Sequence, residues 1–190
     1  MRTHVYLDPK CLKTNLIPAA IELCHRETSG YLMGTNGSTA KRVKIVSAYP
    51  IQTDKKAFTY VEPANKSTIN RLDTLLHAMN IKLLGGFHSH PLGPSKLSKS
   101  DIAFIGEKAE KMNLSEWLEL ILSVKKKDFE NRKKRGWDFR LYPRKLGFTV
   151  VTHPYVGYEV TLSGFWLKKN GHGMKVVKEA TLWTNWRREN

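Results

Sequence analysis

The segment GGFHSHPLGPSKLSKSDIAFI, residues 85–105, decides which fold and which chemistry this chain can have. It continues an apolar run, so IKLLGGFHSH, residues 81–90, has the composition of a buried strand. From residue 102 to residue 112, apolar side chains recur at helical spacing after Ser98. Pro91, Gly93 and Pro94 separate the two patterns and indicate a loop. The sequence therefore predicts a strand, a short loop and a helix.

This junction brings together residues that can bind a metal ion. Side chains two positions apart on a strand project from the same face, so His88 and His90 can point at one place. Asp101 lies in the first turn of the following helix, from which its carboxylate can reach the end of the strand. Two imidazoles and one carboxylate are a common set of protein ligands for catalytic zinc. The alternative is an ordinary strand-to-helix loop, in which Ser98 and Asp101 form a helix cap.

The rest of the chain predicts further strands and helices. Polar and apolar residues alternate at 3–7 as in a strand, and Asp8 followed by Pro9 is a good helix start. A helix to about His25, with a kink at Pro18, is expected to follow. Asn36-Gly37 predicts a hairpin turn between two strands. Other expected elements are a short strand at 58–61, a helix from about residue 65, a buried strand at 117–124 and short strands after residue 145.

The alternation of strands and helices predicts an α/β fold in a single domain spanning residues 1–190, with a mixed, curved β-sheet flanked by helices. The length of 190 residues and the hydrophobic fraction of 41% suit one globular core. We expect a core at about 3–124, a basic insertion at about 125–145 that forms a surface loop, and C-terminal strands at about 146–190.

The composition argues against a membrane span and against a disulfide. No apolar run approaches the roughly 20 residues that a membrane helix requires, and the N-terminus lacks the pattern of a secretory signal. We therefore expect a cytoplasmic protein without membrane partners. Cys11 and Cys24 fall in one predicted helix, about 20 Å apart, which is too far for a disulfide.

The formal net charge of +15 requires an explanation. Much of it lies at residues 125–145, where basic side chains alternate with Trp137, Phe139 and Tyr142. Nucleic-acid binding would use such a mixture for phosphate contact and base stacking. An acidic protein partner and a solvated, lysine-rich surface are the competing interpretations, and we favour these two over nucleic acid.

The segment His88-Ser89-His90-Pro91, followed by Ser98 and Asp101, resembles the signature of the JAMM (also called MPN+) zinc metalloproteases. That family also has an earlier motif, Glu-x-x-Gly-x-x-x-Gly, and ETSGYLMG supplies Glu27, Gly30 and Gly34 at this spacing. The resemblance covers about residues 3–124 and looks closest to the proteasome-lid deubiquitinase and its archaeal homologues. It implies a JAMM (MPN) domain for the expected α/β fold.

The resemblance also implies roles for single residues. His88, His90 and Asp101 would bind one zinc ion, Glu27 would act as general base on the attacking water, and Ser98 would stabilise the oxyanion. The implied activity is that of an isopeptidase, which cleaves the bond between the C-terminal glycine of ubiquitin or a ubiquitin-like modifier and a lysine. A proteasome or an AAA+ unfoldase would be a further partner.

Substrate contacts are expected upstream of the second helix. In relatives, an insertion corresponding to about residues 49–63 lines the groove for the modifier's tail, so strand addition by Phe58, Thr59, Tyr60 and Val61 is expected. Three alternatives stay open: a processing protease for a sulfur-carrier or ubiquitin-like precursor, a nucleic-acid-associated protein like bacterial RadC, and a non-catalytic scaffold.

Overall fold

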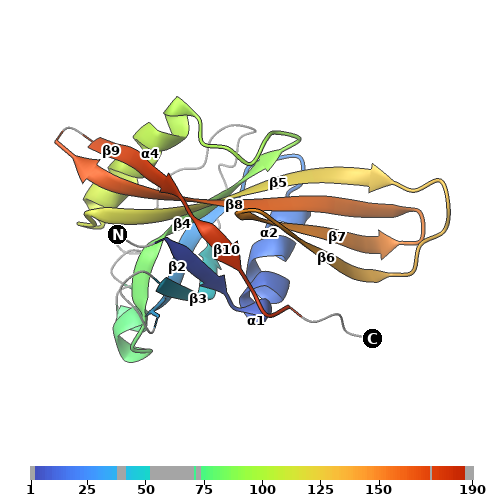
Figure 1. The fold of residues 1–190 in the computed structure, drawn as a ribbon, viewed down its shortest axis with the longest axis horizontal. Coiled ribbons are helices and arrows are strands. Elements are labelled where there is room, and N and C mark those ends of the chain that lie inside the picture. Colours follow the sequence, from blue (N-terminus) through green and yellow to red (C-terminus); the bar gives the residue numbers. More distant parts are fainter. Residues whose placement is uncertain (1–2, 38–41, 52–70, 72–73, 172, 187–190) are drawn as a thin grey trace.

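The computed structural model describes residues 3–37, 42–51, 71, 74–171 and 173–186. Its strands form one ten-stranded sheet with the order β10-β1-β3-β2-β4-β5-β8-β7-β6, and β9 pairs with β8 (Figure 1). The strands are β1 His4–Leu7, β2 Ser29–Asn36, β3 Arg42–Pro50, β4 Lys82–Pro91, β5 Glu116–Asp128, β6 Gly136–Tyr142, β7 Lys145–His153, β8 Val156–Asn170, β9 Gly173–Glu179 and β10 Thr181–Trp183.

The described helical segments are α1 Pro9–Cys11, the π-helical turn η1 Leu12–Leu16, α2 Ile17–Glu22, α4 Lys99–Lys111 and the turn at 74–78. Asp8 caps α1 as expected, because its carboxylate accepts the N–H of Lys10 at 2.9 Å. The π-helical turn lies just before Pro18, where the missing N–H weakens α-helical hydrogen bonding. None of these segments is long and apolar enough to cross a membrane.

The sheet mixes parallel and antiparallel neighbours. β1 runs parallel to β3 and β10, and β4 runs parallel to β5, whereas the other pairs are antiparallel. β2 and β3 form the predicted hairpin, in which the N–H of Gly37 donates to the carbonyl of Arg42. At the other end of the chain, the N–H of Ala180 donates to Gly164 of β8, and Leu182 packs over that glycine. The edge strand β10 therefore folds back on β8, and the sheet is nearly closed.

Two apolar clusters stabilise this sheet. The larger one fills the inside of the curve between α1–α2 and strands that include β7, β8 and β10. The smaller one lies under α4, where Ile105 and Ala109 pack with Trp117 and Leu167. Burial of such side chains is the main favourable term in folding.

The expected α/β class, a JAMM (MPN) domain with a sheet flanked by helices, is wrong. The described part of the chain is mostly strand and forms a nearly closed, barrel-like sheet with few helices. Everything described after α4 is strand, turn or extended chain, and the strands from β5 to β8 extend beyond the helices (Figure 1). The expectation went wrong because the resemblance covered only the N-terminal part of the chain.

The segment 125–145, predicted to be a surface loop, is mainly strand. β5 continues to Asp128, and β6 begins at Gly136. These residues pair with β8 and β7, so hydrogen bonds to neighbouring strands compensate for their polar composition. The loop itself is limited to the tip between β5 and β6.

Candidate metal centre

The predicted strand-loop-helix unit is present as β4, a loop and α4. β4 lies between β2 and β5, with His88 opposite Ser29 on one side and beside Ile121 on the other. The loop is held against the sheet, because the N–H of Leu92 donates to Val124 at 3.0 Å and the Ser123 hydroxyl donates to the carbonyl of Gly93. The end of β4 and the start of α4 are thereby fixed relative to each other.

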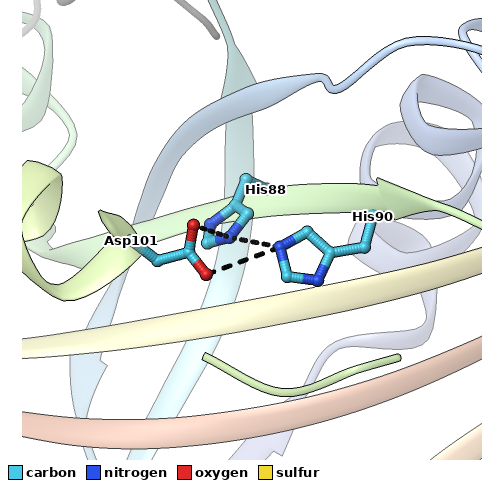
Figure 2. Close-up of side chains that lie close together, drawn as sticks. All are labelled: His88, His90 and Asp101. Atoms are coloured by element: carbon cyan, nitrogen blue, oxygen red, sulfur yellow. Dashed lines mark hydrogen bonds and ion pairs between the residues drawn. The ribbon is translucent and has the colours of Figure 1, made fainter. Parts of the chain in front are cut away.

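His88, His90 and Asp101 converge at this junction and could hold a metal ion (Figure 2). The Nε2 atoms of the two histidines are 3.1 Å apart. Asp101 Oδ1 is 3.7 Å from His88 Nε2, and Oδ2 is 3.6 Å from His90 Nε2. His88 is buried, while His90 and Asp101 are partly exposed. One side of the group is therefore open to solvent.

Both imidazoles are anchored through the nitrogen that faces away from the group. His88 Nδ1 lies 2.6 Å from Glu119 Oε1, and His90 Nδ1 lies 2.8 Å from the carbonyl oxygen of Pro94. In a neutral imidazole, a carboxylate or carbonyl acceptor places the proton on Nδ1 and leaves the lone pair on Nε2 for a metal ion. This arrangement is typical of histidines that bind metals.

Sequence reasoning missed Glu119. It lies near the start of β5, 2% exposed, and its second carboxylate oxygen accepts the indole N–H of Trp117 at 2.5 Å. A charged residue inside the apolar run WLELILSV was an available signal, because buried carboxylates need hydrogen-bonding partners. The partner could not be inferred without the register of β4 on β5.

Asp101 is positioned by the first turn of α4. The N–H of Ser98 donates to Asp101 Oδ2 at 2.6 Å, and the N–H of Asp101 donates to Ser98 Oγ at 3.1 Å. These two bonds form a capping box, which fixes the carboxylate next to the histidines. The alternative considered from the sequence, a helix cap, is present, and the same cap builds the metal-binding group.

The charges of the group favour a cation between its members. Burial alone would lower the pKa of His88, but Asp101 and Glu119 outweigh this effect and raise that pKa to about 9. Burial would raise the pKa of Asp101, yet its contacts with His88 and His90 hold that pKa well below its usual range. The carboxylates thus stabilise positive charge at the place where the ligand atoms meet.

Glu27 lies close to this group. The N–H of Ser89 donates to Thr28 O at 2.8 Å, and continuing the antiparallel register of β2 and β4 places Glu27 opposite His90. Burial raises the pKa of Glu27 above its ordinary value, while the charges of His88 and His90 oppose that rise. A half-buried carboxylate beside the group can accept a proton more readily than an exposed one.

Of the remaining predicted site residues, the structure describes Ser98 but not the substrate-binding strand. Ser98 is exposed at the start of α4, and its hydroxyl also lies 2.8 Å from the hydroxyl of Ser100. The predicted substrate-binding strand, Phe58, Thr59, Tyr60 and Val61, lies outside the described residues.

The spacing of the ligand atoms suits a tetrahedral metal. Metal–ligand bonds of about 2.0–2.1 Å place neighbouring tetrahedral ligands about 3.3 Å apart, and octahedral ones about 2.9 Å apart. The two Nε2 atoms, 3.1 Å apart, lie midway between these values, and the distances from each Nε2 to its nearest Asp101 oxygen, 3.7 Å to Oδ1 and 3.6 Å to Oδ2, lie closer to the tetrahedral value. Small side-chain movements are enough to bring the three ligands onto one ion.

Comparison with known proteins adds information about the fold. No family model and no curated protein matches the chain. A similar solved structure is the solution structure of protein DSY2949 from Desulfitobacterium hafniense, with a TM-score of 0.52 and 19% sequence identity. The match covers 97% of this chain and 95% of that chain. At this identity the likeness concerns the fold alone, so any function has to be argued from the residues of the centre.

Proposed function

We propose that this chain is a zinc-dependent isopeptidase that hydrolyses the bond between the C-terminal glycine of ubiquitin, or of a ubiquitin-like modifier, and a lysine. The observation that carries the proposal is the convergence of two histidine Nε2 atoms and one carboxylate. Both Nδ1 atoms are hydrogen-bonded on the side that faces away from this group. Proteins use this donor set for catalytic zinc with an open coordination position.

Each residue of the centre has a defined part in the proposed reaction. His88, His90 and Asp101 would hold the ion, which supplies a Lewis acid that lowers the pKa of water toward neutrality. Glu27 would take the proton of the attacking water and pass it to the leaving amine. Its partial burial and raised pKa support this role. Ser98, exposed beside Asp101, would donate its hydroxyl hydrogen to the developing oxyanion.

The nature of the substrate rests on the motif resemblance. The two motifs, which contain Glu27 and the segment from His88 to Asp101, resemble those of enzymes that act on ubiquitin-like tails. A processing protease for a sulfur-carrier precursor would use the same chemistry on a linear peptide bond. The two substrates differ in the leaving group, which is a lysine side chain in one and a backbone amine in the other.

Metal content and cleavage should be measured on the same preparation. The purified chain is loaded with zinc, its metal is counted by mass spectrometry, and it is incubated with modifier conjugates ending in Gly-Gly. One set carries an isopeptide-linked lysine reporter and the other a linear extension. We expect one zinc per chain and cleavage of the isopeptide that a chelator abolishes.

The Glu27→Gln variant separates zinc binding from catalysis. It should keep the zinc and lose cleavage by roughly 100-fold or more, because the amide cannot take a proton. Glu22→Gln is the matched control, since Glu22 is exposed at the end of α2. A chain that binds no zinc, or a Glu27→Gln variant that cleaves at the original rate with zinc bound, would show that the proposed mechanism is wrong. Preferential cleavage of the linear fusion would identify a processing protease instead.

A further inference from the structure

The strands that leave the metal centre end in a surface that we propose binds the phosphate backbone of nucleic acid. β5 passes the centre beside His88 and His90, and its pairing with β4 ends at Val124. It then continues with β8 for four more residues, Lys125 to Asp128. In Figure 1 the ends of β5, β6, β7 and β8 project away from the helices. We call their far end the basic tip, defined by Arg132, Lys133, Lys134, Arg135 and Pro154.

The basic tip has a defined structure. The N–H of Phe129 donates to Tyr155 O, and the N–H of Lys133 donates to Pro154 O, each at 2.7 Å. The Phe129 ring also lies against Gly157, where an added Cβ would come within 3.0 Å of it. The β5–β6 loop is therefore fixed to the β7–β8 turn. A fixed loop loses less conformational entropy when it binds a ligand than a free one does.

Positive charge is concentrated at the basic tip, where the nearest acidic residues in the sequence are Glu130 and Asp138. Its four basic residues are exposed and line a shallow pocket of about 460 Å³ with Pro154. Among the described residues, no ion pair joins any of these four to a carboxylate. Nearer the body, Lys126 pairs with Asp128 and Lys127 pairs with Glu159. Four adjacent cations repel one another, so a bound anion would stabilise this arrangement.

Two further features favour nucleic acid over an acidic protein. Tyr155, directly after Pro154, is 50% exposed, and its ring lies 6.2 Å from that of His153. An exposed aromatic ring beside cations suits stacking on a base or sugar. The basic tip also lies at the end of a projecting four-stranded part of the sheet, β5-β8-β7-β6, so its cations can reach adjacent phosphates of a duplex without a clash from the body of the protein. From Ser123, which pairs with His90, β5 extends about 17 Å to Asp128 before the loop begins, so the basic tip can bind while the metal centre acts.

This inference does not depend on the proposed hydrolase activity, and binding can be measured on the full chain alone. We would titrate fluorescent 20-mers of duplex DNA, duplex RNA and single strands with the protein and follow anisotropy from about 50 to about 300 mM salt. The wild type should bind with a steep negative dependence on salt. The three probes identify which form of nucleic acid is preferred.

The decisive comparison uses two variants of equal net charge. One replaces the four tip residues: Arg132→Gln, Lys133→Gln, Lys134→Gln and Arg135→Gln. The other replaces four exposed lysines of the β8–β9 hairpin: Lys168→Gln, Lys169→Gln, Lys175→Gln and Lys178→Gln. The tip variant should bind at least about 10-fold more weakly at 0.1 M salt, with a salt slope shallower by about 3 to 4, whereas the hairpin variant should stay close to wild type.

Three outcomes would overturn the inference. In the first, the wild type does not bind any of the probes. In the second, both variants weaken equally, which would mean that net charge alone drives binding. In the third, polyglutamate at equal charge competes as well as DNA, which would assign the basic tip to an acidic protein. Because all eight substituted residues are exposed, thermal unfolding should remain unchanged and confirm that each variant is folded.

Discussion

His88 Nδ1 lies 2.6 Å from Glu119 Oε1, so a carboxylate on β5 orients a proposed metal ligand on β4. The other oxygen of Glu119 accepts the indole N–H of Trp117. Both bonds are buried, and together they leave this carboxylate little freedom to rotate. The direction in which His88 Nε2 points is therefore set by the pairing of two parallel strands.

We expect Glu119→Gln to weaken metal binding by about 10- to 100-fold, the usual effect of losing a partner behind a histidine ligand. A carboxamide offers one oxygen, so it can satisfy His88 or Trp117 but presents an N–H₂ group to the other. The dissociation constant can be measured by competition with a chromophoric chelator. Glu159→Gln, an exposed change on β8, is the control. Equal affinity in both variants would contradict a positioning role for Glu119.

Gly85 lies in β4, three residues before His88, and allows β4 to approach β5 closely. Its φ is +152°, and a Cβ there would lie 1.9 Å from the carbonyl oxygen of Leu118. We expect Gly85→Ala to lower the free energy of unfolding by more than about 2 kcal/mol, because either the strands or the backbone must shift. Gly173→Ala is the control, since an added Cβ there meets no atom within 4 Å. Urea denaturation measures the free energy of unfolding of both variants. Similar losses in the two would show that the backbone of Leu118 leaves room for a Cβ at residue 85.

The local parts of the centre could be predicted from sequence because they depend on short-range geometry. The two-residue period of a strand places His88 and His90 on one face. The spacing of Ser98 and Asp101 is that of a capping box, and both hydrogen bonds of that box are present. Glu119 could not be predicted as a partner, because its contact with His88 joins residues 31 positions apart. Such a contact depends on strand register, which the sequence leaves undetermined.

The long strands after residue 124 were missed for a different reason. A high density of charge is typical of loops, and it concealed the alternation of Trp137 and Phe139 with polar neighbours. Both rings pack on Trp186 from the C-terminal segment, with centroids 5.5 and 6.3 Å away. Pairing with distant strands and this aromatic contact therefore stabilise a segment whose local composition favours a loop. The α/β prediction failed at the same place.

Stability at alkaline pH should depend on Cys11. Burial, with a smaller contribution from Asp8, raises the pKa of its thiol from 9.0 to about 12. Between these values the unfolded chain has released the proton and the folded chain retains it. The unfolded state then binds fewer protons, so the free energy of unfolding falls as pH rises, by up to about 1.4 kcal/mol per pH unit.

Urea denaturation in half-unit steps from about pH 8 to about pH 11 measures this slope. Cys11→Ala should be less stable at every pH because a buried side chain is shortened, but it should lose the part of the slope that the thiol causes. Cys24→Ala, at a partly exposed position that packs against the same apolar cluster, should keep the slope. Identical slopes in the two variants would assign the alkaline loss to other groups.

Ser98 can be tested for its two roles separately. As the N-cap of α4 it accepts the N–H of Asp101, so Ser98→Ala should lower the free energy of unfolding by about 1 kcal/mol. Metal affinity should change little, because the Asp101 carboxylate accepts the backbone N–H of residue 98, which alanine keeps. Ser98→Thr retains a hydroxyl and should restore most of the stability.

The catalytic role predicts an additional loss in rate. If the Ser98 hydroxyl stabilises the oxyanion, Ser98→Ala should lower kcat by about 100- to 1000-fold at full metal loading, while Ser98→Thr keeps much of the activity. Ser100→Ala is the control, because it removes the neighbouring hydroxyl and leaves the cap intact. A Ser98→Ala variant that is less stable but cleaves at the wild-type rate would limit Ser98 to the helix cap. Oxyanion stabilisation would then have to come from another group at the open side of the centre.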